Sequence, residues 1–383
     1  MKFAATTLTF IWILSFFSPL YSHGEFEENQ SILQAKNYIE SQQYDQAKSI
    51  LNEAAADFKT NNDVDHYIET QTYLMLTYHH LGDYSAAIAL GKELQNNFPS
   101  ELKSNAKLNI LYHYSLGINY IDTQSQNELG VSYMHRASRL NNGNRINEAN
   151  FQSKITTQIA RGHYYNMAYD SSIRYYQKAI DSYIGEHKYA LHISKGFLGM
   201  ANAYWGLKQL DKAAHYYDKS LNLLYQAKTI DSLAIGKALH SQGYIYLDAK
   251  ENNKALQTFK KAYSYLKDNL PLVHPSKVWL LGDIGRTLIY LESYDSALVY
   301  LQKALIANTF GFDDDDPFSN PQLVNVNDEF QQFMILKLKG QVLCEKYLSQ
   351  RQPKDLRLMK STFKLGDAQI DEIRRSISVA KDQ

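Results

Sequence analysis

Residues 243–262 read GYIYLDAKENNKALQTFKKA, and residues 285–304 read GRTLIYLESYDSALVYLQKA. Both segments begin with a glycine, carry an alanine 12 positions later and end with a second alanine. Each of these small residues in the second segment lies 42 positions after its counterpart in the first. A fixed period of this size is typical of an array of stacked helical repeats. The stretch from Leu233 to Leu305 therefore contains two consecutive repeats.

The residue types suit a unit of two helices joined by a turn. Gly243 and Ala255 fall on opposite helices of an antiparallel pair, where small residues let the two backbones approach closely. Tyr246 and Phe259 are expected to fill the space beside that contact. The dipeptide Asn252-Asn253 is expected to form the turn, because asparagine favours turns.

The same spacing can be followed through most of the chain at steps of 40 to 43 residues. The small residue of the first helix falls at Ala35, Met75, Gly117, Ala160, Ala201, Gly243 and Gly285. Its partner on the second helix falls at Ala47, Ala87, Gly130, Ser172, Ala213, Ala255 and Ala297. About seven repeats are therefore expected in residues 25–308, with Met75 and Ser172 as the weakest matches.

This pattern resembles the tetratricopeptide repeat family. The copy at residues 197–220 has Phe197, Ala201, Tyr204, Ala213, Tyr217 and Ser220 at the family's signature places. The usual repeat of that family is about 34 residues long, so longer helices are expected here. The resemblance implies an all-α fold, a right-handed superhelical α-solenoid of about eight antiparallel helix pairs.

The period breaks after Asn308. Residues 309–328 are expected to form an acidic loop, because they contain Asp313 to Asp316 and two prolines. Residues 329–383 are expected to form a divergent C-terminal helix pair, with Gly340 and Met359 at the places of the small residues. The last helix has no glycine or proline stop, so we expect a further domain to follow it.

The last part of the chain also resembles a second family. The Asp-rich loop with Asn320-Pro321, the segment 335–340 and the tail 370–381 look like the linker in bacterial CHAT-domain proteins. In that family a repeat array precedes a caspase-like domain with a histidine and a cysteine. The resemblance implies that this chain is the N-terminal arm of a peptidase-like protein whose catalytic domain is missing here.

Residues 1–24 resemble a signal peptide. Lys2 is followed by an apolar run from Leu8 to Phe17, and Ser22-His23-Gly24 offers a cleavage site. The protein is therefore expected to be exported to the periplasm, the cell envelope or the medium. An uncleaved membrane anchor is the alternative, although the apolar run is short for a bilayer span.

The composition argues against several functions. Lys and Arg together number 40, as do Asp and Glu, so the formal net charge is zero and nothing steers the chain toward nucleic acid. Cys344 is the single cysteine, which excludes an internal disulfide and makes a structural role more plausible than a nucleophilic one. The four consecutive aspartates lack calcium-loop spacing, and the adjacent His79 and His80 cannot share one helical face. We expect no metal, no cofactor, no small-molecule substrate and no enzymatic activity.

The family resemblance points to a peptide-binding groove. In tetratricopeptide repeats, side chains of the first helix of each pair face the concave surface, and here many of them are basic or aromatic. The candidate residues are Lys154, Arg161, Tyr164, Tyr165, Lys195, Asn202, Trp205, Lys237, His240, Tyr244, Arg286 and Tyr290. Such a row is expected to bind an acidic, aromatic-containing peptide or a partner domain, and the missing C-terminal domain is one candidate partner. The alternative is a mixed surface without a ligand.

The expected function is a protein–protein interaction or docking module. Its most specific form is the exported arm of a CHAT-type protein. A stand-alone extracytoplasmic scaffold and the sensor region of a signalling protein are the alternatives.

Overall fold

The structure is a computed structural model that describes residues 29–41, 43–123, 126–142, 146, 150–183, 189–227, 231–271 and 273–381. The signal peptide predicted at residues 1–24 lies outside this range. In the described part of the chain, no helix is both long enough and apolar enough to span a membrane.

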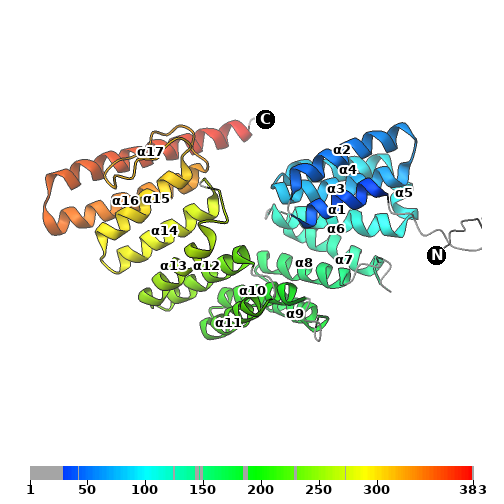
Figure 1. Cartoon of the computed structure of the whole chain (residues 1–383), viewed down its shortest axis with the longest axis horizontal. Coiled ribbons are helices and arrows are strands. Elements are labelled where there is room, and N and C mark those ends of the chain that lie inside the picture. The colour runs from blue at the N-terminus through cyan, green and yellow to red at the C-terminus, as the bar shows by residue number, and fades with distance from the viewer. Residues whose placement is uncertain are drawn as a thin grey trace, which may run out of the picture. The chain divides into compact units, whose positions relative to one another are not determined.

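The described residues form 17 α-helices and no strand (Figure 1). The helices are α1 Gln30–Glu40, α2 Tyr44–Thr60, α3 Val64–Leu81, α4 Tyr84–Asn97, α5 Pro99–Ser104, α6 Ala106–Asp122, α7 Asn127–Leu140, α8 Phe151–Tyr165, α9 Tyr169–Asp181, α10 Ala190–Gly206, α11 Leu210–Gln226, α12 Ser232–Asp248, α13 Asn252–Leu266, α14 Pro275–Tyr290, α15 Tyr294–Asn308, α16 Glu329–Gln350 and α17 Pro353–Lys381.

The helices pack in sequential pairs, and each pair stacks on the next within its part of the molecule. The chain divides into two compact units, with the boundary between Leu102 and Lys103. The pairs α1–α2 and α3–α4 belong to the first unit, and the pairs from α6–α7 to α16–α17 belong to the second. The predicted all-α array of stacked helix pairs is therefore confirmed.

Packing inside the pairs follows the spacing of the small residues. Ala255 has no exposed surface, and the ring of Phe259 lies against the backbone of Gly243. A Cβ atom added to Gly243 would lie only 2.3 Å from that ring. The next pair repeats the contact, with Leu301 against Gly285. The two weakest sequence matches, Met75 and Ser172, are also fully buried.

The turns inside the pairs differ from the prediction. The residue with a left-handed backbone is Lys250, at φ 59°, and Asn252 is already the first residue of α13. The N–H groups of Lys250 and Glu251 donate to the carbonyl groups of Leu247 and Tyr246, which closes the end of α12 in a Schellman-type cap. The prediction of Asn252-Asn253 as the turn was therefore wrong by two residues. Equivalent left-handed residues recur at Met167, Lys208 and Glu292.

Residues 309–328 form a packed segment that we call the strap. Its two ends meet where Thr309 bridges Val326 and where the N–H of Asn327 donates to the carbonyl of Asn308 at 2.8 Å. The aspartates 313–316 are exposed, as expected of a solvated loop. The strap nevertheless covers the ammonium group of Lys339 on α16, which donates to the carbonyl of Ser319.

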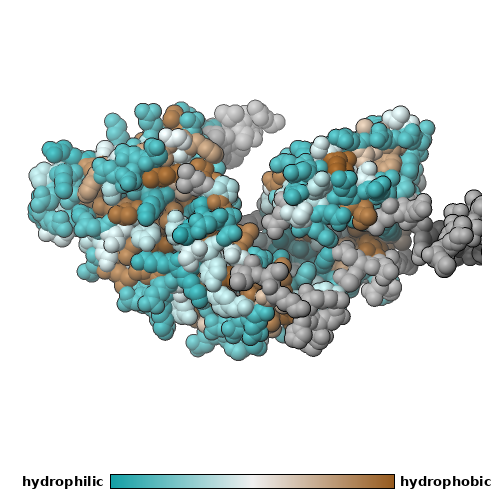
Figure 2. All heavy atoms as spheres, viewed as in Figure 1, coloured by the Kyte–Doolittle hydropathy of each residue, from teal (hydrophilic) through white to brown (hydrophobic). Residues whose placement is uncertain are grey.

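The last pair uses the same type of contact in longer helices. The ring of Phe363 on α17 lies against Gly340 on α16, and Met359 is half-buried one turn before that ring. Ile370 and Ile373 are half-buried, whereas the side chain of Ile377 is outside the described residues. On the face shown in Figure 2, apolar side chains form small patches among hydrophilic ones.

Candidate functional site

The predicted groove residues all lie on α8, α10, α12 and α14, the first helices of four consecutive pairs in the second compact unit. We call the surface that these helices form the inner-helix face. The candidates fall at recurring places, because each pair repeats the same register. Arg161, Asn202, Tyr244 and Arg286 each follow the small residue of their helix directly.

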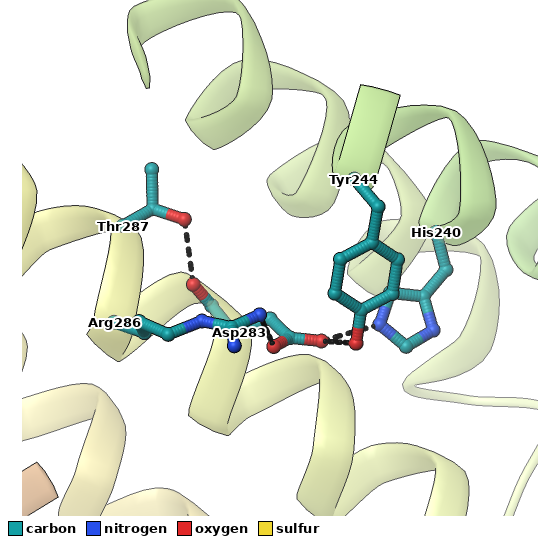
Figure 3. A network of polar contacts seen from close by, with 5 residues as sticks. All are labelled: His240, Tyr244, Asp283, Arg286 and Thr287. Atoms are coloured by element: carbon teal, nitrogen blue, oxygen red, sulfur yellow. Dashed lines mark hydrogen bonds and ion pairs between the residues drawn. The ribbon is translucent and has the colours of Figure 1, made fainter. Parts of the chain in front are cut away.

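A buried carboxylate joins α12 to α14, the last two helices of this face (Figure 3). Asp283 on α14 is 5% exposed and accepts hydrogen bonds from three side chains. His240 Nε2 lies 2.7 Å and the Tyr244 hydroxyl 2.5 Å from Oδ2. Arg286 donates to Oδ1 at 2.6 Å from one turn along α14. Three donors satisfy the buried carboxylate and fix the orientation of the three donating side chains.

Tyr244 is also the centre of a stack that reaches α10. The Trp205 ring lies nearly parallel to the Tyr244 ring, with 5.7 Å between the centroids. The guanidinium carbon of Arg286 lies 5.7 Å from the same Tyr244 centroid. Burial, followed by the Asp283 charge, raises the pKa of Tyr244, so its hydroxyl remains a hydrogen-bond donor near neutral pH. The indole nitrogen of Trp205 in turn donates to Asp248 at 2.7 Å.

A second polar bridge joins α8 to α6. Arg161 donates to Asp122 at 2.9 Å, and both side chains are largely buried. Tyr164 and Tyr165 on α8 are in edge-on contact, with ring centroids 5.6 Å apart. Burial raises the pKa of both tyrosines.

Three acidic residues that were not among the predicted groove residues bind side chains of this face. They are Asp122, Asp248 and Asp283. Asp122 and Asp248 each stand five positions after the glycine of their helix, so the repeat register already contained their signal. The predicted groove included the cations and aromatic rings of this register but not its acids. Arg161, Trp205 and Arg286 each make a polar contact within the array, so these groove candidates also have a structural role.

The lysines at the other end of the inner helices differ from these paired cations. Lys195 and Lys237 take the same register place on α10 and α12, and both side chains reach solvent. No hydrogen bond or ion pair is found for either ammonium group among the described residues. Partial burial, with a smaller contribution from Lys237, lowers the pKa of Lys195, whereas Asp231 opposes that shift. Lys237 also helps to lower the pKa of His274, after burial.

The other candidates are separate from these clusters. Asn202 accepts a hydrogen bond from the hydroxyl of buried Tyr217, so it packs within its own pair. Lys154 is half-buried near the start of α8. Tyr290 is 56% exposed at the end of α14.

Cys344, His79 and His80 are the remaining residues that the sequence analysis considered. Cys344 is half-buried and unpaired. The rings of His79 and His80 are in edge-on contact with one another. Within the described ranges, no group of three or more histidine, cysteine or acidic side chains could hold a metal ion.

Comparisons with known proteins agree with this architecture. The tetratricopeptide repeat model matches residues 195–223, which cover part of α10 and most of α11. The outer dynein arm-docking complex subunit 4 of Danio rerio is 29% identical over 110 residues, or 28% of this chain. That match covers 21% of the relative, so the chain aligns with about a fifth of its length.

Two solved proteins share the fold at low sequence identity. The apo form of RapI is 14% identical, with a TM-score of 0.57 over 90% of this chain and 98% of that chain. The apo form of the quorum sensor NprR from B. thuringiensis is 14% identical, with a TM-score of 0.56 over 88% and 97%. NprR in complex with its cognate peptide NprX gives 0.54 over 94% and 100%, at 14% identity. The chain thus contains a tetratricopeptide repeat within a solenoid of the kind that these structures have.

Proposed function

We propose that this protein is a peptide-binding docking module and that the inner-helix face of α8, α10, α12 and α14 is its binding surface. A protein-interaction role fits the repeat fold and the peptide complex known for the structurally similar NprR. The observation that carries the proposal is the stack of Trp205, Tyr244 and Arg286, held from both sides by Asp248 and Asp283.

The stack is suited to anchoring an aromatic or apolar side chain. Its rings are fixed by hydrogen bonds before a ligand arrives, so little side-chain freedom is lost on binding. Tryptophan, tyrosine and arginine are also the residue types that contribute most at binding hot spots. Figure 3 shows how the hydrogen bonds from α12 and α14 converge on Asp283.

The carboxylates of an acidic ligand would bind elsewhere on the face. Arg161 and Arg286 already bind Asp122 and Asp283. Lys195 and Lys237 lie at solvent without such a partner among the described residues. An anion bound between Lys195 and Lys237 would be attracted by both ammonium groups. The proposed ligand is therefore an acidic peptide with an aromatic side chain, the carboxylate beside Lys195 and Lys237 and the ring beside Trp205.

Selection from a displayed library of random peptides tests this proposal. Wild-type protein is expected to enrich acidic peptides that contain an aromatic residue. Trp205→Ala is expected to weaken binding of the selected peptides by about tenfold. The double variant Lys195→Ser with Lys237→Ser is expected to weaken it by a similar factor. The lysine variant should also lose most of its salt dependence.

Tyr225→Ala is the matched control, because Tyr225 is an exposed aromatic residue on α11, outside the inner-helix face. It is expected to bind the selected peptides as wild type does, and circular dichroism should show every variant folded. Equal enrichment of the same peptides by wild type and both site variants would contradict the assignment of this face.

The setting of the module is a separate part of the proposal. On the signal-like residues 1–24 and the linker-like residues 309–383, we propose an exported N-terminal arm of a CHAT-type, peptidase-like protein. Cell fractionation would test export. The coding sequence after Gln383 would separate the alternatives. A caspase-like domain supports this form, a stop codon supports a stand-alone scaffold, and a membrane helix with a kinase supports a sensor.

A further inference from the structure

A second groove lies between α9 and α11, which are the second helices of two neighbouring pairs. Its volume is about 470 Å³. One wall is α9, with Ile173, Arg174 and Lys178, and the other wall includes Tyr216 of α11. Met200 and Tyr204 of α10 form the floor between them, because α10 packs against both α9 and α11.

The floor and walls offer an apolar anchoring site. Met200 is 1% exposed, and Ile173 is half-buried. The rings of Tyr204 and Tyr216 are stacked on each other, with centroids 5.2 Å apart and planes 9° from parallel. This stacking closes one face of each ring to a side chain that enters the groove.

The rim of this groove is cationic. Arg174 and Lys178 are exposed on α9, one turn apart. On α11, Lys212 lies 5.3 Å from the Tyr204 centroid and Lys219 lies 5.1 Å from the Tyr216 centroid. The one acid that lines the groove, Asp181, accepts a hydrogen bond from Gln177 at 2.7 Å. Arg174 and Lys178 in the groove wall, with Lys212 and Lys219 beside its two tyrosine rings, complement a negatively charged partner.

From the apolar floor and the cationic rim, we propose that the groove between α9 and α11 is a second docking site, and that it binds an acidic segment of a partner protein through one inserted aliphatic or aromatic side chain. The carboxylates of the segment pair with Arg174 and Lys178, while its anchor side chain covers Met200. This site is independent of the inner-helix face, because none of its residues belongs to the Trp205 and Tyr244 cluster.

The geometry favours a protein segment over a nucleic acid. Base recognition by tyrosine needs an open ring face. The two tyrosine faces that meet are closed to a base, and Lys212 and Lys219 lie over these rings. Asp181 interrupts the cationic rim, so the groove suits a side chain flanked by spaced carboxylates better than a continuous chain of phosphates.

Two measurements test the proposal with defined probes. The first is fluorescence anisotropy with labelled synthetic peptides in which glutamates flank a single leucine, phenylalanine or tryptophan. These peptides are expected to bind at about 100 μM, and versions with lysine in place of glutamate about tenfold more weakly. Arg174→Glu with Lys178→Glu is expected to weaken binding of the acidic peptides by about tenfold or more.

Lys260→Glu with Lys261→Glu is the matched control. It makes the same change of charge on exposed residues of α13, outside the groove, and is expected to leave binding nearly unchanged. The second measurement is NMR of methyl-labelled methionine. The Met200 methyl signal, assigned with Met200→Leu, is expected to shift on peptide addition, whereas the signal of buried Met134 on α7 should not.

Three results would overturn the proposal. They are no binding of any acidic peptide, equal weakening by the α9 and α13 variants, and displacement of the acidic peptides by a single-stranded oligouridine with a larger Met200 shift. The last result would assign the groove to nucleic acid.

Discussion

The regular pairs from α12 to α15 and the last pair, α16–α17, use the same small-residue contact but bury charge in opposite ways. In the regular pairs, Asp283 is buried with three donors, one of them the permanently charged Arg286. In the last pair, Lys339 is completely buried, and its ammonium group donates to Gln302 Oε1 at 2.7 Å and to the carbonyl of Ser319. Its direct acceptors are both neutral.

The difference shows in the titration of the lysine. Burial lowers the pKa of Lys339 from 10.5 to about 8, although Asp316 and Asp314 on the strap oppose the shift. A buried group that contacts an opposite charge stays ionised. A buried group with only neutral acceptors ionises less readily. The Asp283 site is therefore a salt-bridged network, whereas the Lys339 site is an amine covered by the strap.

Removal of the buried carboxylate should produce the largest effect. Asp283→Ala leaves His240, Tyr244 and Arg286 without their common acceptor and is expected to lower the free energy of unfolding by about 3–5 kcal/mol. Chemical denaturation followed by circular dichroism measures the loss.

Two other acids that pair with residues of the inner-helix face serve as graded controls. Asp122→Ala breaks one largely buried pair with Arg161 and should cost about 1–3 kcal/mol. Asp248 is 40% exposed, and Asp248→Ala should cost less than about 1 kcal/mol. Equal losses at all three positions would show that burial of the carboxylate does not set the cost.

The pH dependence of stability should distinguish the last pair. Below pH 8, Lys339 carries a proton in both the folded and the unfolded chain. Between about pH 8 and 10.5 the unfolded chain binds more protons, so the free energy of unfolding rises with pH, by up to about 3 kcal/mol. Lys339→Met is expected to abolish that rise.

The quantity to measure is the wild-type minus variant difference in denaturation free energy at several pH values from 7 to about 10. Titration of other groups cancels in this difference. Lys337→Met, an exposed site two residues away on α16, should retain the rise. A Lys339→Met chain with unchanged pH dependence would show that the amine does not titrate in this window.

Small effects of opposite sign should come from two glycines of the last pair. A Cβ at Gly340 would lie 2.6 Å from the Phe363 ring, so Gly340→Ala is expected to destabilise by about 1–2 kcal/mol. A Cβ at Gly366 on α17 has its nearest neighbour at 3.9 Å. Gly366→Ala is therefore expected to stabilise by about 0.5–1 kcal/mol, because alanine favours a helix. Thermal melting of both variants checks the comparison, which fails if both shifts have the same sign.

The sequence alone determined the helix pairs and their register. Gly243, Ala255 and Phe259 recur at a fixed spacing because each pair must solve the same packing problem, and periodicity of this kind is visible in one dimension. The sequence also indicated which helices carry the candidate groove. It placed the turn two residues late, because a Schellman-type cap at Lys250 is set by backbone hydrogen bonds that tolerate many residue types.

Only the tertiary structure decided how the side chains of different pairs combine. Asp283 lies 43 residues from His240 and 39 from Tyr244, and no local pattern announces that the three converge. The strap over Lys339 likewise depends on Ser319, which is 20 residues away. Such contacts arise from the stacking of one pair on the next, so their partners are neighbours in space but not in sequence. For that reason the sequence indicated where the cations lie, and the structure distinguished the paired Arg286 from the solvent-facing Lys195 and Lys237.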